Sequence, residues 1–87
     1  MSWNIHPGEI LREEFMKPLE LSSRRLANFL EVPAPRINDI ILERRGITAD
    51  TALKLAKYFK TTPKFWMNLQ VSYELKAAQA EAGRNHV

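Results

Sequence analysis

The sequence predicts an all-α fold built from five helices. Apolar residues recur at spacings of three and four along most of the 87-residue chain, which is the period of an amphipathic helix. Serine, threonine and proline stand where these periodic segments begin, as expected of helix N-termini. The alternation of apolar and polar residues that is typical of a half-buried strand is not found. These observations favour a small helical domain without a sheet.

The first two helices are predicted from the residues at their starts. Pro7 fits the first turn of a helix, and Glu9 is favourable near the positive end of the helix dipole. This helix is expected to end near Pro18, because proline does not continue a helix. Ser22 is a good N-cap for a second helix over about 23–30. The residues expected on the buried faces are Ile10, Leu11, Phe15 and Leu19 in the first helix and Leu26, Ala27 and Leu30 in the second.

A tight turn and a third helix follow. The turn is expected at 31–33, with Val32 pointing into the core. Pro35 fits the first turn of a helix over about 34–42, where no backbone donor is lost. Gly46 is expected to give the following loop its conformational freedom. The residues that the third helix should bury are Ile37 and Ile40.

Two further helices complete the chain. Thr48 is expected to cap the fourth helix, with Asp50 favourable in its first turn. Thr62 followed by Pro63 predicts the start of a fifth helix, which Gly83 should end after about residue 82. The residues expected to face inward from the fourth helix are Ala52, Leu53, Ala56 and Phe59.

The chain is long enough for one domain, near the lower limit for a single apolar core. We expect this domain to cover residues 5–82, with flexible termini at 1–4 and 83–87. Cysteine is absent, which excludes a disulfide and a thiolate metal site. The sequence has neither an apolar run long enough to span a bilayer nor a signal-peptide pattern at its start. These features predict a protein of the cytoplasm.

Residues 22–45 combine two short amphipathic helices, a tight turn and a loop with two arginines. A helix-turn-helix motif needs this arrangement, with one helix braced on the phosphate backbone and the next presented to the major groove. Helix N-termini and hydroxyl groups bind phosphate, and arginines add positive charge. The residues predicted to contact DNA are Ser22, Ser23, Arg24, Arg25, Ala34, Pro35, Arg36, Asn38, Arg44 and Arg45.

Several kinds of contact are predicted within this set. Arg36 suits guanine and Asn38 suits adenine through two-point hydrogen bonding, whereas the alanine and proline offer only apolar contact, for example to a thymine methyl. The two arginines of the loop are expected to reach phosphates. Alternatives remain open, because Arg36 would pair with Asp39 on a solvated helix face, and Ser22 would serve only as an N-cap.

Charge is unevenly distributed, although the net charge is only +3. Residues 9–20 carry four glutamates against one arginine and one lysine, whereas 44–64 carry six basic residues against a single aspartate. The basic segment would neutralise phosphates, which dominate affinity for nucleic acids. Scattered charges on solvated helices are the alternative interpretation.

Phe65, Trp66, Leu69 and Tyr73 form an apolar stripe on the predicted fifth helix. Paired DNA half-sites require a two-fold dimer, so we expect part of this stripe to pack against a second copy of the chain. Ordinary core packing is the alternative, and it is favoured for the tryptophan and the leucine.

Catalysis is not supported by the sequence. His6 and His86 lie near opposite ends and suggest neither a metal cluster nor a base beside a nucleophile. Glu13 and Glu14 are neighbours on a helix and therefore do not face each other. With three glycines in all, no glycine-rich phosphate loop is present. We expect a binding protein that needs no cofactor and no metal.

Four segments carry a resemblance to a known family: HPGEILREEF, RRLANFLEVPAPRINDI, RRGITADTALKLAKYF and TTPKFWMNLQ. They resemble the HigA/VapI group of antitoxins, within the Cro/CI-like (Xre) helix-turn-helix family, over about residues 5–76. The combination of RGITADTALKLA with FWMNLQ is the most specific part, because it lies outside the DNA-reading helix. The resemblance implies a lambda-repressor-like fold and a homodimer that binds a palindromic operator and represses its own operon. It also implies binding of a HigB-like toxin, a RelE-like ribonuclease that cleaves mRNA.

One departure from the family pattern concerns 33–35, Pro-Ala-Pro, where such proteins often place polar residues. Base reading would then depend more on the arginine and asparagine that follow. The acidic first helix is expected to engage a basic toxin through the folded surface rather than through a tail. Two alternatives stay open: a stand-alone Xre-type regulator without a toxin, and a protein-binding module of the same fold that no longer reads DNA.

Overall fold

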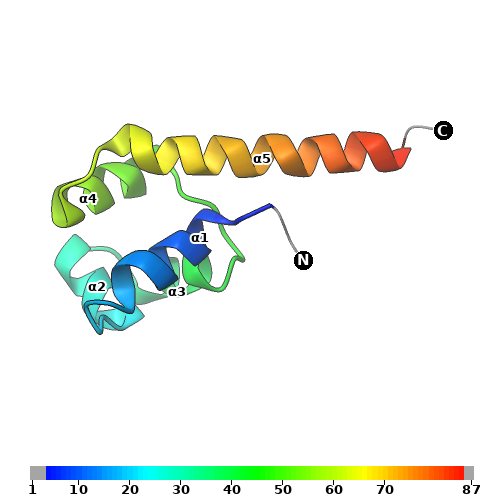
Figure 1. Cartoon of the computed structure of the whole chain (residues 1–87). Helices are drawn as coiled ribbons and strands as arrows, with labels where there is room; N and C mark the ends of the chain where they lie inside the picture. Colours follow the sequence, from blue (N-terminus) through cyan, green and yellow to red (C-terminus); the bar gives the residue numbers. More distant parts are fainter. Residues whose placement is uncertain (1–3, 86–87) are drawn as a thin grey trace.

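In a computed structural model, which describes residues 4–85, the chain folds into helices joined by short loops (Figure 1). The elements are α1 (Pro7–Ile10), η1 (Leu11–Met16), α2 (Ser23–Leu30), α3 (Ala34–Ile41), α4 (Ala49–Phe59) and α5 (Pro63–Asn85). Because α1 runs directly into the π-helical η1, they form one helix, and the predicted five-helix, all-α fold is confirmed; residues 4–85 contain no strand. Figure 1 shows α1, α2 and α3 in one group, α4 and α5 in another, and α5 reaching well beyond both.

Side-chain caps start three of the helices. The hydroxyls of Ser22 and Thr62 each accept a 3.1 Å hydrogen bond from the backbone N–H three residues later. His6 begins α1 in the same way, since its Nδ1 accepts a 2.8 Å hydrogen bond from the N–H of Gly8. Thr48 precedes α4 as predicted, but its hydroxyl lies 3.4 Å from another threonine hydroxyl instead of capping the helix. Local polar side chains therefore fix most of the helix starts.

Four non-glycine residues adopt the left-handed conformation at or just beyond the ends of helices. They are Glu20, Glu31, Glu43 and Lys60, with φ between 53° and 63°. Glu31 ends α2 and Lys60 ends α4. Glycine is the usual residue in this position, because a Cβ atom is strained there. Because no glycine stands at these positions, the sequence does not show where these helices end.

The C-terminal end of the fold differs from the prediction. The prediction that Gly83 ends the last helix is wrong, because α5 continues to Asn85. An isolated glycine weakens an exposed helix by only about 1 kcal/mol, so it does not have to stop one. Of the predicted flexible termini, 1–3 and 86–87 lie outside the described residues.

One apolar core lies between the two groups of helices. Two predicted inward residues prove to be about 59% exposed: Leu53 and Leu19. Leu53 lies about 100° around α4 from the buried Ala52, so Leu55 occupies the core position instead. Leu19 falls in the turn after η1. The buried apolar residues are Leu11, Met16, Leu26, Ala27, Leu30, Ile37, Ile40, Ile47, Ala52, Leu55, Ala56 and Trp66.

Two glycines allow segments to approach closely. A Cβ atom on Gly8 would overlap the backbone carbonyl oxygen of Ile40, so α1 packs directly on α3. A Cβ atom on Gly46 would lie 2.6 Å from the side-chain nitrogen of Gln70. Neither glycine has a positive φ. The predicted role of Gly46 is therefore corrected: the loop needs space there for a side chain of α5, and its backbone conformation does not require glycine.

Candidate nucleic-acid interface

α2 and α3 pack against each other and form the predicted helix-turn-helix. The turn between them is held by the N–H of Val32, which donates a 3.0 Å hydrogen bond to the carbonyl of Ala27. Val32 is half-buried against the core, as expected. The apolar residues that the two helices share with the core are Leu26, Ala27, Leu30, Ile37 and Ile40. Burial of these faces leaves polar residues on the outer surface of the pair.

The first turn of α2 carries the first group of predicted DNA-contact residues. Ser22 is exposed and caps the helix, and Ser23 is half-buried. Arg24 and Arg25 are exposed, and no ion pair within residues 4–85 involves either of them. Both positive charges therefore remain available beside a helix N-terminus, where backbone N–H groups favour an anion such as phosphate.

The predicted reading helix, α3, presents its residues unequally. Pro35 and Asn38 are exposed, whereas Ala34 is half-buried and packs against the core. Part of the Ala34 side chain therefore packs α3 against the core and is not available to DNA. Asn38 retains an exposed amide, which has the donor and acceptor that adenine needs in the major groove.

Arg36 is the least exposed arginine of the predicted contact set and is held by a carboxylate. Its Nη1 lies 3.1 Å from Oδ2 of Asp50, which stands in the first turn of α4. The side chains of Arg36 and Asp50 are 31% and 63% exposed. The alternative considered from the sequence, pairing with Asp39 one helical turn away, is wrong.

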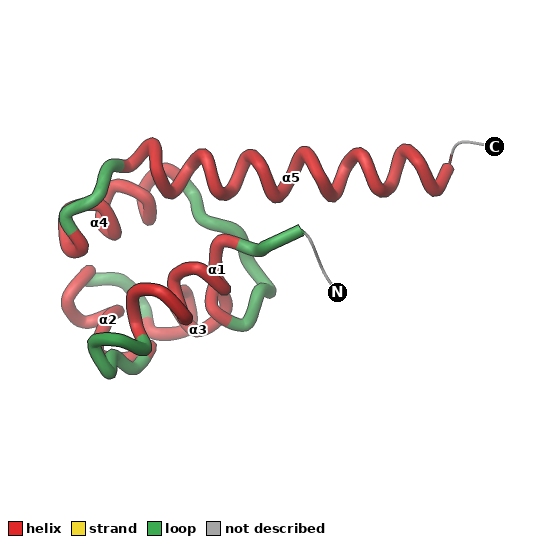
Figure 2. The backbone as a smooth tube through the Cα atoms, viewed as in Figure 1, coloured by secondary structure: helices red, strands yellow, loops and turns green. Residues whose placement is uncertain are grey.

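Arg44 and Arg45 lie in the loop that joins α3 to α4, and Figure 2 shows the path of the loops in green. The loop leaves α3 through Glu43, and the N–H of Arg44 donates a 2.8 Å hydrogen bond to the carbonyl of Asp39. Both arginines are exposed, and within the described range neither enters an ion pair. Contact of these two arginines with phosphates stays a prediction, with which their exposure is compatible.

A side chain of α5 anchors the far end of this loop. The carbonyl oxygen of the Gln70 side chain accepts a 2.7 Å hydrogen bond from the buried N–H of Ile47. The Gln70 amide nitrogen in turn donates a 2.8 Å hydrogen bond to Glu74. Gln70 is itself buried. This chain of hydrogen bonds ties the arginine loop to the fifth helix and satisfies a buried backbone donor.

An open cleft of about 610 Å³ lies where α3, the arginine loop, α4 and α5 meet. Arg36 and Arg45 line it together with the acidic residues Asp50 and Glu74. Opposite charges therefore share the cleft, and the pair joining α3 to α4 forms part of its wall.

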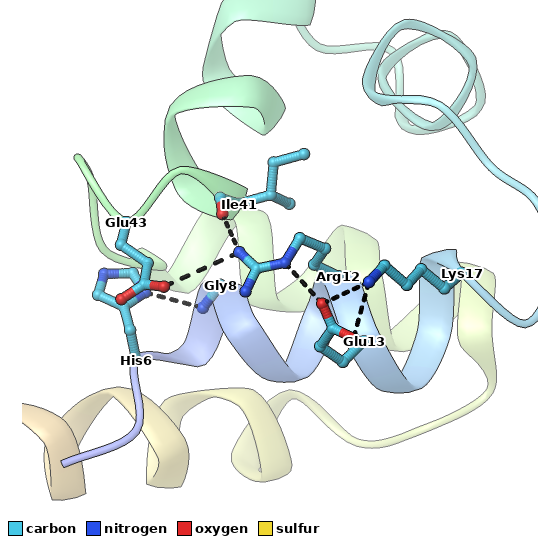
Figure 3. Close-up of polar contacts among 7 residues, drawn as sticks. All are labelled: His6, Gly8, Arg12, Glu13, Lys17, Ile41 and Glu43. Carbon is cyan, nitrogen blue, oxygen red and sulfur yellow. Dashed lines mark hydrogen bonds and ion pairs between the residues drawn. The ribbon is translucent and has the colours of Figure 1, made fainter. Parts of the chain in front are cut away.

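One glutamate of the acidic first helix, Glu13, is held by contacts within the chain (Figure 3). Nε of Arg12 lies 2.9 Å from Glu13, while its Nη1 donates a hydrogen bond to the carbonyl of Ile41 and lies 3.8 Å from Glu43. Nζ of Lys17 also lies 2.9 Å from Glu13. Hydrogen bonds from Arg12 and Lys17 lower the pKa of Glu13. The acidity predicted for this segment is thus partly balanced within the chain.

The predicted dimer residues of α5 differ in how far they are buried in the domain. Trp66 is fully buried, and its Nε1 donates a 2.7 Å hydrogen bond to the hydroxyl of Thr61. Its inclusion among the interface residues is therefore wrong, and the core interpretation holds. Leu69 also packs against the core. Tyr73 is half-buried, with its ring edge-on to that of His6 at a centroid distance of 4.7 Å; Phe65 is 37% exposed.

Further along α5, two apolar side chains that sequence reasoning did not select are open to solvent. Val71 is 48% exposed and Leu75 is 57% exposed. Their spacing of four residues places them on one face of the helix. They line a shallow hollow of about 400 Å³ whose other walls are polar residues of α5.

Sequence reasoning also missed the roles of Asp50 and Gln70. Asp50 was predicted only as a favourable first-turn residue, and its partner lies 14 positions away in the chain. Gln70 lies 23 positions from the N–H that it holds. No local pattern gives either pairing, because both depend on how separate helices pack.

Neither a membrane-spanning helix nor a cluster of metal-binding side chains is found within residues 4–85. No helix between residues 4 and 85 is long and apolar enough to cross a membrane. No group of three or more histidine, cysteine, aspartate or glutamate side chains in that range could hold a metal ion.

Comparison with known proteins relates the chain to regulators and antitoxins. A family model described as helix-turn-helix matches residues 13–66. Virulence-associated protein I of Dichelobacter nodosus is 54% identical over 77 residues, which are 88% of this chain and 71% of that protein. An uncharacterised HTH-type transcriptional regulator of Haemophilus influenzae is 47% identical over 68 residues, covering 78% of this chain and 64% of the regulator. The chain thus spans less than two thirds of the second relative.

A solved structure agrees with this relationship. Antitoxin HigA of Pseudomonas aeruginosa, solved with the higBA promoter, is 52% identical and superposes with a TM-score of 0.91. The match covers 93% of this chain and 88% of that antitoxin. Such helix-turn-helix regulators and antitoxins are not enzymes, in agreement with the sequence prediction. The chain belongs to the helix-turn-helix family that includes virulence-associated protein I and the HigA antitoxins.

Proposed function

We propose that this protein is the antitoxin of a type II toxin–antitoxin pair and a sequence-specific repressor of its own operon. The observation that carries the proposal is the 52% identity, at a TM-score of 0.91, to an antitoxin solved with its promoter. That likeness extends over the helix-turn-helix, so the same elements are available here for DNA.

The proposed DNA contacts divide between two kinds of recognition. Phosphates are met by Ser22 and Ser23 at the start of α2, by the neighbouring exposed arginines, and by the arginine loop. Bases are read from α3, where Arg36 and Asn38 supply the bidentate groups and Pro35 an apolar surface. Phosphate contacts set affinity and orientation, whereas the contacts of α3 select the sequence.

The protein acts as a homodimer on a palindromic operator. A helix-turn-helix dimer places its two reading helices in half-sites about one turn of DNA apart, roughly 34 Å. The second copy is expected to pack on the outer face of α5, where Val71 and Leu75 are exposed. Tyr73 lies on the opposite side of α5 from these two residues, with its ring against His6, and Phe65 has its ring beside that of Phe15, so neither is expected in this contact. Leu75→Arg should therefore lower both the dimer fraction in light scattering and operator affinity.

The second partner is a HigB-like toxin of the RelE-like ribonuclease class. Glu14 and Glu20 are exposed, and no ion pair within residues 4–85 involves them. These carboxylates offer charge complementarity to a basic ribonuclease. A variant that lacks residues 83–87 should still neutralise the toxin, whereas Glu14→Lys should weaken the complex. Loss of toxin binding on removal of the tail alone would show that the contact lies elsewhere.

Footprinting on the DNA immediately upstream of the gene tests the repressor function. Protection of a two-fold symmetric site that survives random duplex as competitor is expected. Measurement at two salt concentrations separates this from charge attraction, because non-specific binding disappears on all sequences as salt rises. Binding that is equal on every duplex would contradict the proposal and favour a protein-binding module of the same fold.

Variants of the contact residues then divide the two kinds of recognition. Arg36→Ala should lower discrimination between operator and random DNA by about 1–3 kcal/mol. Replacing Arg44 and Arg45 together by alanine should weaken binding to both DNAs and flatten its salt dependence. An unchanged salt slope would remove the loop from the interface. Lys64→Ala at the start of α5 is a control that removes one exposed positive charge outside both the helix-turn-helix and the hollow beside Val71 and Leu75.

A stand-alone regulator is the second candidate, because the Haemophilus influenzae relative is described as a transcriptional regulator. The two functions differ in the toxin alone. Co-expression with the product of a neighbouring reading frame for a small basic protein separates them: rescue of growth indicates an antitoxin.

A further inference from the structure

Arg36, which contacts Asp50, differs from the other arginines of the proposed DNA-binding set. Of the five arginines in that set, Arg36 is the one that has a carboxylate partner within residues 4–85. It is also the only one of the five that is half-buried instead of exposed. The pair joins the reading helix to the start of α4, so it exists only in the folded domain.

The contact occupies one edge of the guanidinium. Nη1 of Arg36 donates to Oδ2 of Asp50 over 3.1 Å, and within the described range this is the single hydrogen bond of the arginine side chain. A guanidinium carries five N–H donors in a planar fork. The remaining donors are sufficient for two-point bonding to O6 and N7 of a guanine. One carboxylate can therefore hold the group while another edge reads a base.

Holding the side chain has two consequences for recognition. A free arginine samples many rotamers, and that freedom is lost when it docks on a base; a side chain already held loses less. The carboxylate also offsets the arginine charge, which reduces its attraction for phosphates of any sequence. The first effect favours the operator, and the second disfavours other DNA.

We propose that Asp50 is a specificity-determining residue, which positions the Arg36 guanidinium for base reading and limits its non-specific attraction to phosphate. The inference rests on the proposed DNA-binding function and adds to it a residue outside the helix-turn-helix. Asp50→Asn should raise affinity for random duplex and lower the preference for operator by about two- to fivefold, the range expected of an exposed ion pair.

The test is a double-mutant cycle measured by fluorescence anisotropy. Wild type, Asp50→Asn, Arg36→Ala and the double variant are titrated with a duplex from directly upstream of the gene and with a scrambled duplex of equal composition. Glu14→Gln is the matched control, because it removes one exposed negative charge from the first helix. Asp50→Glu keeps the negative charge and should retain much of the wild-type preference for the upstream duplex. Thermal unfolding of each variant confirms that it is folded.

The outcomes are distinct. Loss of preference in Asp50→Asn that is absent when Arg36 is already alanine supports the inference. An Asp50→Asn protein with wild-type preference, or an equal loss in both backgrounds, overturns it while leaving the repressor function intact. A preference lost equally in Glu14→Gln would reduce the effect to net charge and overturn it as well. A wild-type protein without preference for the upstream duplex would overturn the proposed function and this inference together.

Discussion

Replacing Gly8 with alanine should destabilise the domain strongly, although alanine is the better helix former. The new Cβ atom would overlap the backbone oxygen of Ile40 and lie 2.8 Å from its carbonyl carbon, whereas ordinary contact begins at 3.4 Å. Both obstructing atoms belong to the backbone of α3, so they cannot rotate away as a side chain would. α1 must withdraw from α3, which disturbs the buried Leu11 and the histidine cap beside it.

The magnitude follows from two opposing terms. Overpacking of a well-packed site costs about 1–3 kcal/mol, and the upper end applies because backbone is in the way. Alanine regains at most about 1 kcal/mol of helix propensity. The net loss is about 2 kcal/mol, against a total stability of about 4–13 kcal/mol for a chain of this length. The midpoint of thermal unfolding should therefore fall by about 8–16 °C.

Urea and thermal unfolding, followed by circular dichroism, measure this loss, and the other two glycines are its controls. Gly83→Ala meets nothing within 4 Å and should stabilise the protein by about 0.5–1 kcal/mol. Gly46→Ala meets the movable amide of Gln70 at 2.6 Å, so its loss should be intermediate. A Gly8→Ala protein that unfolds at or above the wild-type temperature would show that α1 and α3 can separate without loss of stability and would contradict this prediction.

Three further predictions concern a cap, a helix end and a buried donor. Burial lowers the pKa of His6 in the folded state below its ordinary value of 6.5. The neutral imidazole therefore stabilises the fold fully at pH values above 6.5, and this stabilisation is lost as the pH falls through the lower folded-state pKa. His6→Asn should reduce the difference in melting temperature between about pH 8 and about pH 5.5, which lie about 1 to 1.5 units on either side of the ordinary value, and an unreduced difference would exclude His6 as its source. Lys60→Gly should stabilise by about 1 kcal/mol in urea unfolding because its φ is 60°, with Lys60→Ala as the control that keeps the strain. Gln70→Met should cost about 1–3 kcal/mol because the N–H of Ile47 loses its acceptor, whereas exchanging the two residues as Gln70→Glu with Glu74→Gln keeps both that acceptor and a donor to it; equal stabilities would contradict this.

The helical fold could be predicted from the sequence, because most of the signals for it are local. Ser22 caps α2, and Pro63 lies at the first position of α5, as predicted. Periodic burial of Leu26 and Leu30 also follows from a single helix face. A cap or a stripe involves residues at most a few positions apart, so the chain carries the information without its tertiary contacts. The family resemblance implied the same helical fold over almost the whole domain.

The contacts of individual side chains, in contrast, depend on how the helices pack against one another. Arg36 was expected to be free or paired one turn away, yet its partner comes from the next helix. Trp66 was open to two interpretations until packing enclosed it completely. Gly8 and Gly46 gained their importance from atoms that lie 32 and 24 residues further along the chain. The physical reason is common to all four: helical periodicity fixes which residues share a face, but it does not determine which other face they meet.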